Sequence, residues 1–273
     1  MRAARPLDVP RADGGGLATS SAAGTDGAEG GLLGGAERAV ADFAEVADPA
    51  APGFRENGAI FVNLPRGEGL ARCSGTSVDA PNMSVVFTAG HCVNDGGFGK
   101  WFDRDWIFVP GYHDGVRPYG VFVAKWLGVT RPWIEGGSEN GDVGAAVVSR
   151  NEHGQRLGAA VGGYGIAWNL SPRQVFDVHG YPAAAPFDGA SQRLCTGKPF
   201  LGHDFASFLW LGPLNMAVDC PLTGGASGGG WTIRGDVLNS VTDYGYSDDA
   251  RTTFGPYFGR AVGALYRQAA RVK

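Results

Sequence analysis

Long apolar runs, dense charge and basic clusters are all missing from this sequence. No hydrophobic stretch approaches the ~20 residues that a bilayer-spanning helix needs, so we expect no membrane partner. Only 18% of the residues are charged, the net charge is −4, and no basic block occurs. Nucleic-acid binding therefore lacks electrostatic support. With 44% hydrophobic residues, the chain is expected to be a globular protein in water.

Cysteine pairs of the C-x-x-C type and clusters of metal ligands are missing as well, so we expect no metal and no cofactor. The cysteines are four in number and widely spaced: Cys73, Cys92, Cys195 and Cys220. An even count favours two disulfides, which persist in oxidising compartments, and this predicts a secreted protein. Residues 1–50 nevertheless contain no apolar signal core of about 7–15 residues. We expect that a leader lies upstream or has been left out.

Glycine is abundant, with 46 residues against a usual share of about 7%, which indicates many turns. From residue 59 onward, short β-rich runs such as 85–88, 106–109 and 237–241 alternate with Gly, Pro, Asn and Asp. This pattern predicts an all-β barrel or sandwich. The last segment differs, because Phe258, Val262 and Leu265 fall at helical spacing, and we expect an α-helix over about 256–270.

The first 57 residues are rich in Gly, Ala, Ser, Asp and Arg and have little apolar surface to bury. They are predicted to be a disordered leader or linker, or a propeptide that is removed on maturation; the two readings are compatible. Residues 58–273 are then the folded domain.

Ser227 lies in a run of glycines, Gly224-Gly225-Ala226-Ser227-Gly228-Gly229-Gly230. Glycines allow a tight turn that exposes a nucleophilic hydroxyl and lets backbone N–H groups reach an oxyanion. The N–H groups of Gly225 and Ser227 are the expected donors, and loss of one such donor typically costs roughly 3–4 kcal/mol of transition-state stabilisation. The alternative is a flexible glycine turn with an incidental serine.

Chain order decides which hydrolase type this serine fits. The run also matches G-x-S-x-G of α/β-hydrolases, in which the histidine follows the serine. Here every histidine precedes Ser227: His91, His113, His153, His179 and His203. Among them His91 is the expected base, because a β-run ends just before it in Thr88-Ala89-Gly90-His91-Cys92. If Cys92 pairs with Cys73, the bridge would add roughly 3 kcal/mol of stability in the chain-entropy model and fix the backbone beside the histidine.

The motifs around Cys73-Ser74-Gly75-Thr76, His91 and Ser227 resemble the chymotrypsin/trypsin superfamily of serine peptidases, most closely its bacterial glutamyl-endopeptidase-like branch. The resemblance covers about residues 58–270. It implies an all-β fold with two six-stranded antiparallel barrels, at about 58–155 and about 156–255, and an active site in the cleft between them. It also implies a monomeric serine endopeptidase that cleaves protein or peptide substrates through an acyl-enzyme.

The resemblance further implies an aspartate that orients His91, between His91 and Ser227 in the chain. Asp142, just before the apolar run 143–148, fits best. Its rivals are Asp95, Asp103, Asp105 and Asp114. Cys195 and Cys220 would tie the second barrel beneath the nucleophile loop. The remaining expected substrate-site residues are Leu222, Asn239 and Ser240, the last in a late strand from which a serine can bond the triad aspartate.

Three departures from the family pattern bear on specificity and activation. Ala226 precedes the serine where an aspartate would pair with a freed N-terminus, so maturation must work differently. Pro221 stands where trypsins have their acidic pocket residue, although Asp219 is close by. No histidine follows His203, which disfavours glutamyl specificity. A catalytically silent homologue that acts as a binding protein is the alternative function.

Overall fold

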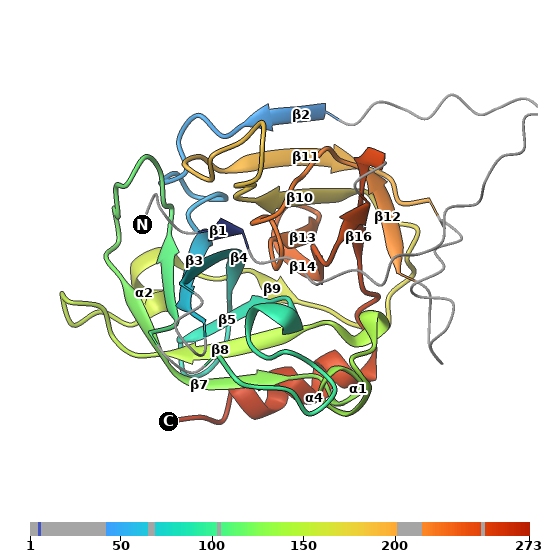
Figure 1. The fold of residues 1–273 in the computed structure, drawn as a ribbon. Coiled ribbons are helices and arrows are strands. Elements are labelled where there is room, and N and C mark those ends of the chain that lie inside the picture. Colours follow the sequence, from blue (N-terminus) through green and yellow to red (C-terminus); the bar gives the residue numbers. More distant parts are fainter. Residues whose placement is uncertain (1–4, 7–41, 65–68, 103–104, 201–214, 247–248) are drawn as a thin grey trace, which may run out of the picture.

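The computed structural model describes residues 5–6, 42–64, 69–102, 105–200, 215–246 and 249–273. Two β-rich halves lie side by side, and a C-terminal helix runs along the first of them (Figure 1). The predicted all-β class is confirmed, with one closed six-stranded barrel, further sheets that are consistent with the second half of a trypsin-like fold, and a C-terminal helix.

The first half is a closed barrel, because its sheet order β4-β3-β6-β7-β8-β5 returns through a β4–β5 pairing. Its strands are β3 Asn57–Asn63, β4 Leu70–Val78, β5 Val85–Thr88, β6 Ile107–Pro110, β7 Phe122–Val129 and β8 Gly144–Val148. The two-residue strand β1, Arg5–Pro6, adds to β4 in parallel. All neighbouring strands of the barrel pair antiparallel.

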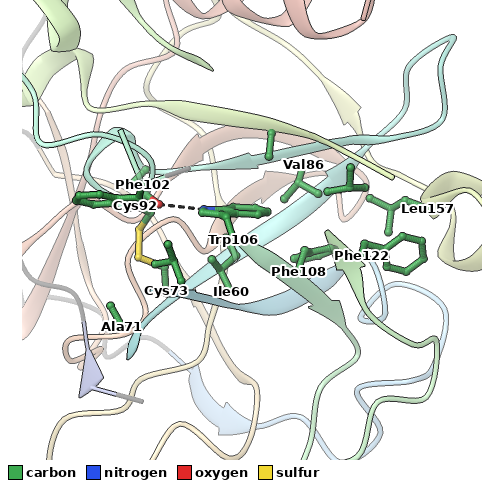
Figure 2. Close-up of a cluster of buried hydrophobic side chains, with 14 of the residues drawn as sticks. Ile60, Ala71, Cys73, Val86, Cys92, Phe102, Trp106, Phe108, Phe122 and Leu157 are labelled. Carbon is green, nitrogen blue, oxygen red and sulfur yellow. Dashed lines mark hydrogen bonds between the residues drawn. A yellow bond between two sulfur atoms is a disulfide. The ribbon is translucent and has the colours of Figure 1, made fainter. Parts of the chain in front are cut away.

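Large apolar side chains fill this barrel (Figure 2). Phe108 and Phe122 are fully buried beside Trp106. The Trp106 indole also donates a hydrogen bond of 3.0 Å from Nε1 to the carbonyl oxygen of Cys92. The barrel core thereby holds the backbone of the residue next to His91.

The second half contains two sheets rather than one closed hydrogen-bonded ladder. A six-stranded sheet has the order β2-β11-β10-β13-β14-β9, and a three-stranded sheet has the order β12-β16-β15. Their bounds are β2 Asp42–Glu45, β9 Gly165–Ile166, β10 Phe176–Gly180, β11 Arg193–Gly197, β12 Met216–Asp219, β13 Gly230–Ile233, β14 Val237–Val241, β15 Gly245–Tyr246 and β16 Asp249–Gly255.

Helix α4, Arg260–Ala269, is the predicted C-terminal helix. Its buried residues Val262 and Leu265 pack with Phe87 and Val147 of the first barrel. Short helical segments that the sequence pattern did not predict lie in the connections: η2 Gly90–Cys92, α1 Arg131–Gly136, η3 Glu139–Gly141 and α2 Leu157–Val161. None of the helices in the described ranges combines the length and apolarity that crossing a bilayer requires.

The expected domain boundary at residue 58 falls inside folded structure. Strand β2 pairs antiparallel with β11, from Asp42 opposite Thr196 to Glu45 opposite Arg193. The same two end residues form an ion pair of 2.6 Å between Arg193 Nη2 and Glu45 Oε2. Residues 42–57 therefore belong to the folded unit, because the edge of β11 supplies the hydrogen-bonding partner that a local sequence pattern cannot show. Residues 7–41 lie outside the described ranges.

Candidate active site

His91 lies in the short η2 turn that directly follows strand β5. The predicted disulfide between Cys73 and Cys92 is present and ties this turn to strand β4. Gly90 is required here, because a Cβ at this position would come within 2.6 Å of Asp142 Oδ1 and 2.8 Å of the Trp133 ring. The imidazole is almost fully enclosed, with 6% of its side chain exposed.

Asp142 contacts His91 through both of its carboxylate oxygens. Oδ2 lies 2.5 Å from Nδ1 of the imidazole, and Oδ1 accepts a 2.7 Å hydrogen bond from the backbone N–H of His91. The aspartate sits between the η3 turn and strand β8, and its side chain is fully buried. This two-point contact fixes both the tautomer and the orientation of the ring, with the proton on Nδ1.

Burial alone would raise the pKa of Asp142, because it removes the carboxylate from water. The positive charge of His91 and the hydrogen bonds from its side chain and backbone outweigh burial, so the pKa of Asp142 lies below its ordinary value. An ionised aspartate is therefore available to stabilise a positively charged imidazole.

Ser227 lies on the loop between β12 and β13, in the second half of the molecule. Its carbonyl oxygen accepts a 2.7 Å hydrogen bond from the N–H of Ser74, on β4 of the first barrel. The Ser74 hydroxyl accepts from the N–H of Tyr181 and donates 2.9 Å to the carbonyl of Gly225. Ser74 of the first barrel thus holds the loop of the second half that carries Ser227.

Gly225 adopts a φ of +94°, and a Cβ there would lie 2.8 Å from the Cβ of Ala183. A side chain would therefore be both strained and blocked at this position. Within the described part of the chain, the Gly225 amide donates to no acceptor. A backbone donor beside the serine is thus available to an incoming oxygen.

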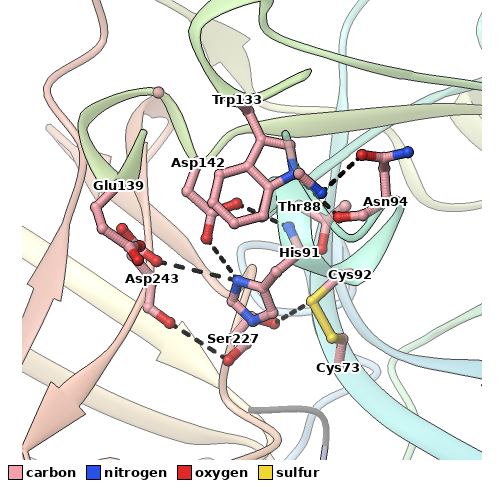
Figure 3. A network of polar contacts seen from close by, with 12 residues as sticks. Cys73, Thr88, His91, Cys92, Asn94, Trp133, Glu139, Asp142, Ser227 and Asp243 are labelled. Carbon is pink, nitrogen blue, oxygen red and sulfur yellow. Dashed lines mark hydrogen bonds and ion pairs between the residues drawn. A yellow bond between two sulfur atoms is a disulfide. The ribbon is translucent and has the colours of Figure 1, made fainter. Parts of the chain in front are cut away.

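The two halves bring Ser227 and His91 together (Figure 3). In this view the imidazole lies between Asp142 on one side and Ser227 on the other. The hydroxyl of Ser227 also approaches the carbonyl oxygen of Asp243 at 3.4 Å. Ser227 is only 5% exposed.

Asp243 is a buried acid of this site that the sequence pattern did not identify. Its Oδ1 lies 4.0 Å from Nδ1 of His91, and its side chain is fully enclosed. The only available signal was its position in the same late segment as Ser240, three residues further along. Nothing in the local residues distinguishes it from a solvated turn aspartate.

The structure gives specific contacts for the three residues expected at the substrate site. Ser240 donates a 2.8 Å hydrogen bond to the carbonyl of Pro256 rather than to Asp142. Asn239 donates 2.8 Å to the carbonyl of Ala167. Leu222 packs in the core of the second half. The path of the chain through β14 and the residues after it thus places Asp243, not Ser240, opposite His91.

The rival acids lie away from His91. Asp95, Asp105 and Asp114 are exposed, and Asp103 lies outside the described residues. Two groupings with metal-ligand chemistry occur in the described ranges: Cys73 with His91 and Cys92, and His91 with Asp142 and Asp243. In the first grouping, Cys73 and Cys92 are bonded to each other as a disulfide. In the second, His91 already bonds to Asp142 through the nitrogen that would bind a metal.

The second predicted disulfide, Cys195–Cys220, is also present and links β11 to the end of β12. The hydroxyl of Thr253 donates 2.6 Å to the carbonyl of Cys220. The segment that leads into the Ser227 loop is therefore held both covalently and by the three-stranded sheet.

Comparison with solved structures gives many matches. Protease Anisep from Arthrobacter nicotinovorans has 36% sequence identity and a TM-score of 0.74, over 82% of this chain and 99% of that protein. The thermostable serine protease AL20, from an extremophilic microorganism, has 32% identity and a TM-score of 0.73, over 80% of this chain and 98% of that protein.

A Glu endopeptidase in complex with MPD has 18% identity and a TM-score of 0.66, over 84% of this chain and 97% of that protein. At this identity the likeness concerns the fold alone. No family profile and no curated protein matches the sequence.

Proposed function

Since this chain belongs to the chymotrypsin/trypsin-like serine peptidases, we propose that its endopeptidase activity depends on Ser227, His91 and Asp142. The observation that carries this proposal is the contact of 2.5 Å between His91 Nδ1 and Asp142 Oδ2 inside a buried site that also contains Ser227. That contact is the orienting half of a Ser-His-Asp triad.

The reaction follows from these positions. Nε2 of His91 takes the proton of the Ser227 hydroxyl as Oγ bonds to the peptide carbonyl carbon, and the charge that develops on His91 is stabilised by Asp142. The N–H groups of Gly225 and Ser227 hydrogen-bond the oxyanion. The imidazolium then protonates the leaving amine as the peptide bond breaks, which leaves an ester on Ser227. Water, deprotonated by His91, hydrolyses that ester and restores the hydroxyl.

The proposal extends to the setting of the enzyme. Its substrates are proteins or peptides. Two disulfides suit an oxidising compartment, and we propose that the protein is secreted and acts as a monomer. Ala226, whose side chain is fully buried before the nucleophile, offers no carboxylate to a freed N-terminus. If residues before the folded unit are removed on maturation, their removal therefore activates the enzyme without that ion pair.

Labelling with a fluorophosphonate probe tests the nucleophile. The parent protein is expected to bind one probe per molecule and to cleave a denatured protein substrate. Ser227→Ala should abolish both the label and the cleavage, and His91→Ala should slow both by at least ~10³-fold, because the serine loses its base. Ser171→Ala, which removes an exposed serine, should behave as the parent.

Two results would contradict the proposal. A label that survives in Ser227→Ala would identify another nucleophile. A parent protein that takes up no label would instead favour the silent homologue that acts by binding.

A further inference from the structure

Asp243 gives the proposed site a second buried carboxyl group (Figure 3). Its Oδ1 lies 4.0 Å from Nδ1 of His91, the same nitrogen that contacts Asp142. Ligating atoms of His91, Asp142 and Asp243 all lie within 4.8 Å of one another, and the three residues are buried. One imidazole therefore faces two carboxyl groups, where the triad mechanism needs only one.

The position of Asp243 is fixed by both its backbone and its side chain. Its N–H donates 2.8 Å to the carbonyl of Phe254, and Nδ2 of Asn215 donates 3.2 Å to its Oδ2. Its carbonyl oxygen lies 3.4 Å from the Ser227 hydroxyl. Since Oδ2 is engaged by Asn215, Oδ1 is the oxygen that faces His91. Asp243 thus touches or faces every member of the proposed triad.

The charges around Asp243 determine its protonation. Two carboxylates this close and out of water do not both ionise, because the like charges are poorly screened. Nδ2 of Asn215, which donates to Asp243, also lies 3.4 Å from the carbonyl oxygen of Glu139 in the η3 turn, so a third acidic residue comes from the same neighbourhood. Asp142 accepts hydrogen bonds from both the backbone and the imidazole of His91, whereas the side chain of Asp243 accepts one from Asn215. These contacts favour the negative charge on Asp142 and the shared proton on Asp243. The lowered pKa of Asp142, caused by the His91 charge and hydrogen bonds from His91 and Asp243, agrees with this placement.

We propose that Asp243 is a positioning residue that stays protonated in the active enzyme and donates a hydrogen bond to the Asp142 carboxylate. The two acids share one proton, so the imidazole faces a single negative charge. Asp243 acts through Asp142 by holding the carboxylate in line with Nδ1 of His91. This inference rests on the proposed triad.

Replacement of Asp243 by asparagine separates its ability to donate a hydrogen bond from its ability to carry a charge. Asp243→Asn keeps the shape of the side chain, an oxygen for Asn215 and an N–H donor for Asp142, but it has no charge at any pH. We expect kcat/KM within about 3-fold of the parent and an unchanged acid limb of the pH profile of kcat/KM. Asp243→Ala removes the donor, and kcat should fall about 10-fold, the usual effect of one lost hydrogen bond to a charged group. KM should change little.

Several outcomes overturn the inference. If Asp243 were ionised, Asp243→Asn would remove a negative charge 4.0 Å from the imidazole and move the acid limb down by about one pH unit or more. Parent-like activity of Asp243→Ala would show that the donor is dispensable. An Asp243→Asn protein that fails to fold, or that is as slow as Asp243→Ala, would show that a neutral donor is not sufficient.

Ser227→Ala is assayed beside these variants to separate the two proposals. If Ser227→Ala is inactive and the Asp243 variants all match the parent, only the role of Asp243 fails. If Ser227→Ala keeps its activity, the triad itself is wrong.

Discussion

His179 is a buried histidine that the proposed mechanism does not use. It lies on β10 with the rings of Phe54 and Tyr164 at 6.3 Å each, and Nδ1 is 3.2 Å from Nε2 of Gln192. Burial lowers its pKa from 6.5 to about 4, against the smaller opposing effect of the Asp177 charge. The fold therefore holds this imidazole neutral.

This depressed pKa predicts a loss of stability in mild acid. Below pH 6.5 the unfolded chain protonates His179, whereas the folded protein does so only near pH 4. Between these values the unfolded state binds more protons, so stability falls as the pH drops and by pH 4 the loss reaches about 3 kcal/mol. The free energy of unfolding in urea, determined at pH 7.5, 5.5 and 4, measures this loss of stability.

The matched control for this prediction is His179→Gln, which keeps polar atoms but cannot titrate in this range. Its free energy of unfolding should change less with pH than that of the parent. Equal pH dependence in the two proteins would mean that other groups cause the acid loss.

At the scale of elements, β2 shows how a segment with no apolar pattern becomes part of a sheet. Its four residues are mostly exposed, so hydrophobic periodicity gives no signal. It is stabilised by the backbone pairing with β11, by the ion pair between Glu45 and Arg193, and by Phe43, which packs against the core of the second half. The N-terminal side of the chain thereby covers an edge strand that would otherwise be open to other chains.

Two truncations test the contribution of β2. Removal of residues 1–41 keeps the strand, whereas removal of residues 1–46 deletes it; both remove β1. We expect the longer truncation to unfold at a temperature several degrees lower, because it loses the pairing with β11, and to aggregate more readily. Thermal unfolding followed by circular dichroism compares them. Equal midpoints would show that β2 adds nothing to the folded unit.

At the scale of the whole molecule, the site depends on how the two halves meet. Ser74 of the first barrel forms hydrogen bonds to the loop that carries Ser227 and to Tyr181. Tyr181 directly follows β10, in the six-stranded sheet of the second half. His91 and Asp142 come from the first half, and Ser227 and Asp243 from the second. The contact between the halves therefore sets the distance between His91 and Ser227, the proposed base and nucleophile.

Ser74→Ala tests this contact. The variant loses the hydroxyl that bonds Gly225 and Tyr181, and we expect kcat to fall about 10-fold, the effect of losing one to two net hydrogen bonds that position the loop. Ser77→Ala is the matched control, because Ser77 lies on the same strand and its hydroxyl donates 2.7 Å to Gly162 away from the nucleophile loop. Equal kinetic losses in both variants would indicate general destabilisation instead.

The sequence by itself determined the features that are local. Four patterns can be recognised from neighbouring residues alone. They are the glycine run around Ser227, the Thr-Ala-Gly-His-Cys segment, the alternation of short β-runs with turns, and the apolar periodicity of the last helix. From these the all-β class and the terminal helix were predicted, and His91 and Ser227 were chosen as candidates. The choice of Asp142 and the pairing of Cys195 with Cys220 came from the resemblance to serine peptidases that these motifs carry.

Only the tertiary structure decided which distant residues meet. Asp243 faces His91, Ser240 turns to Pro256, and β2 joins β11, and none of these follows from neighbouring residues. The physical reason is register: a strand's side chains alternate between faces, so pairing with distant strands and the loops that follow set which acid reaches the histidine. That pairing forms only when the whole chain has folded.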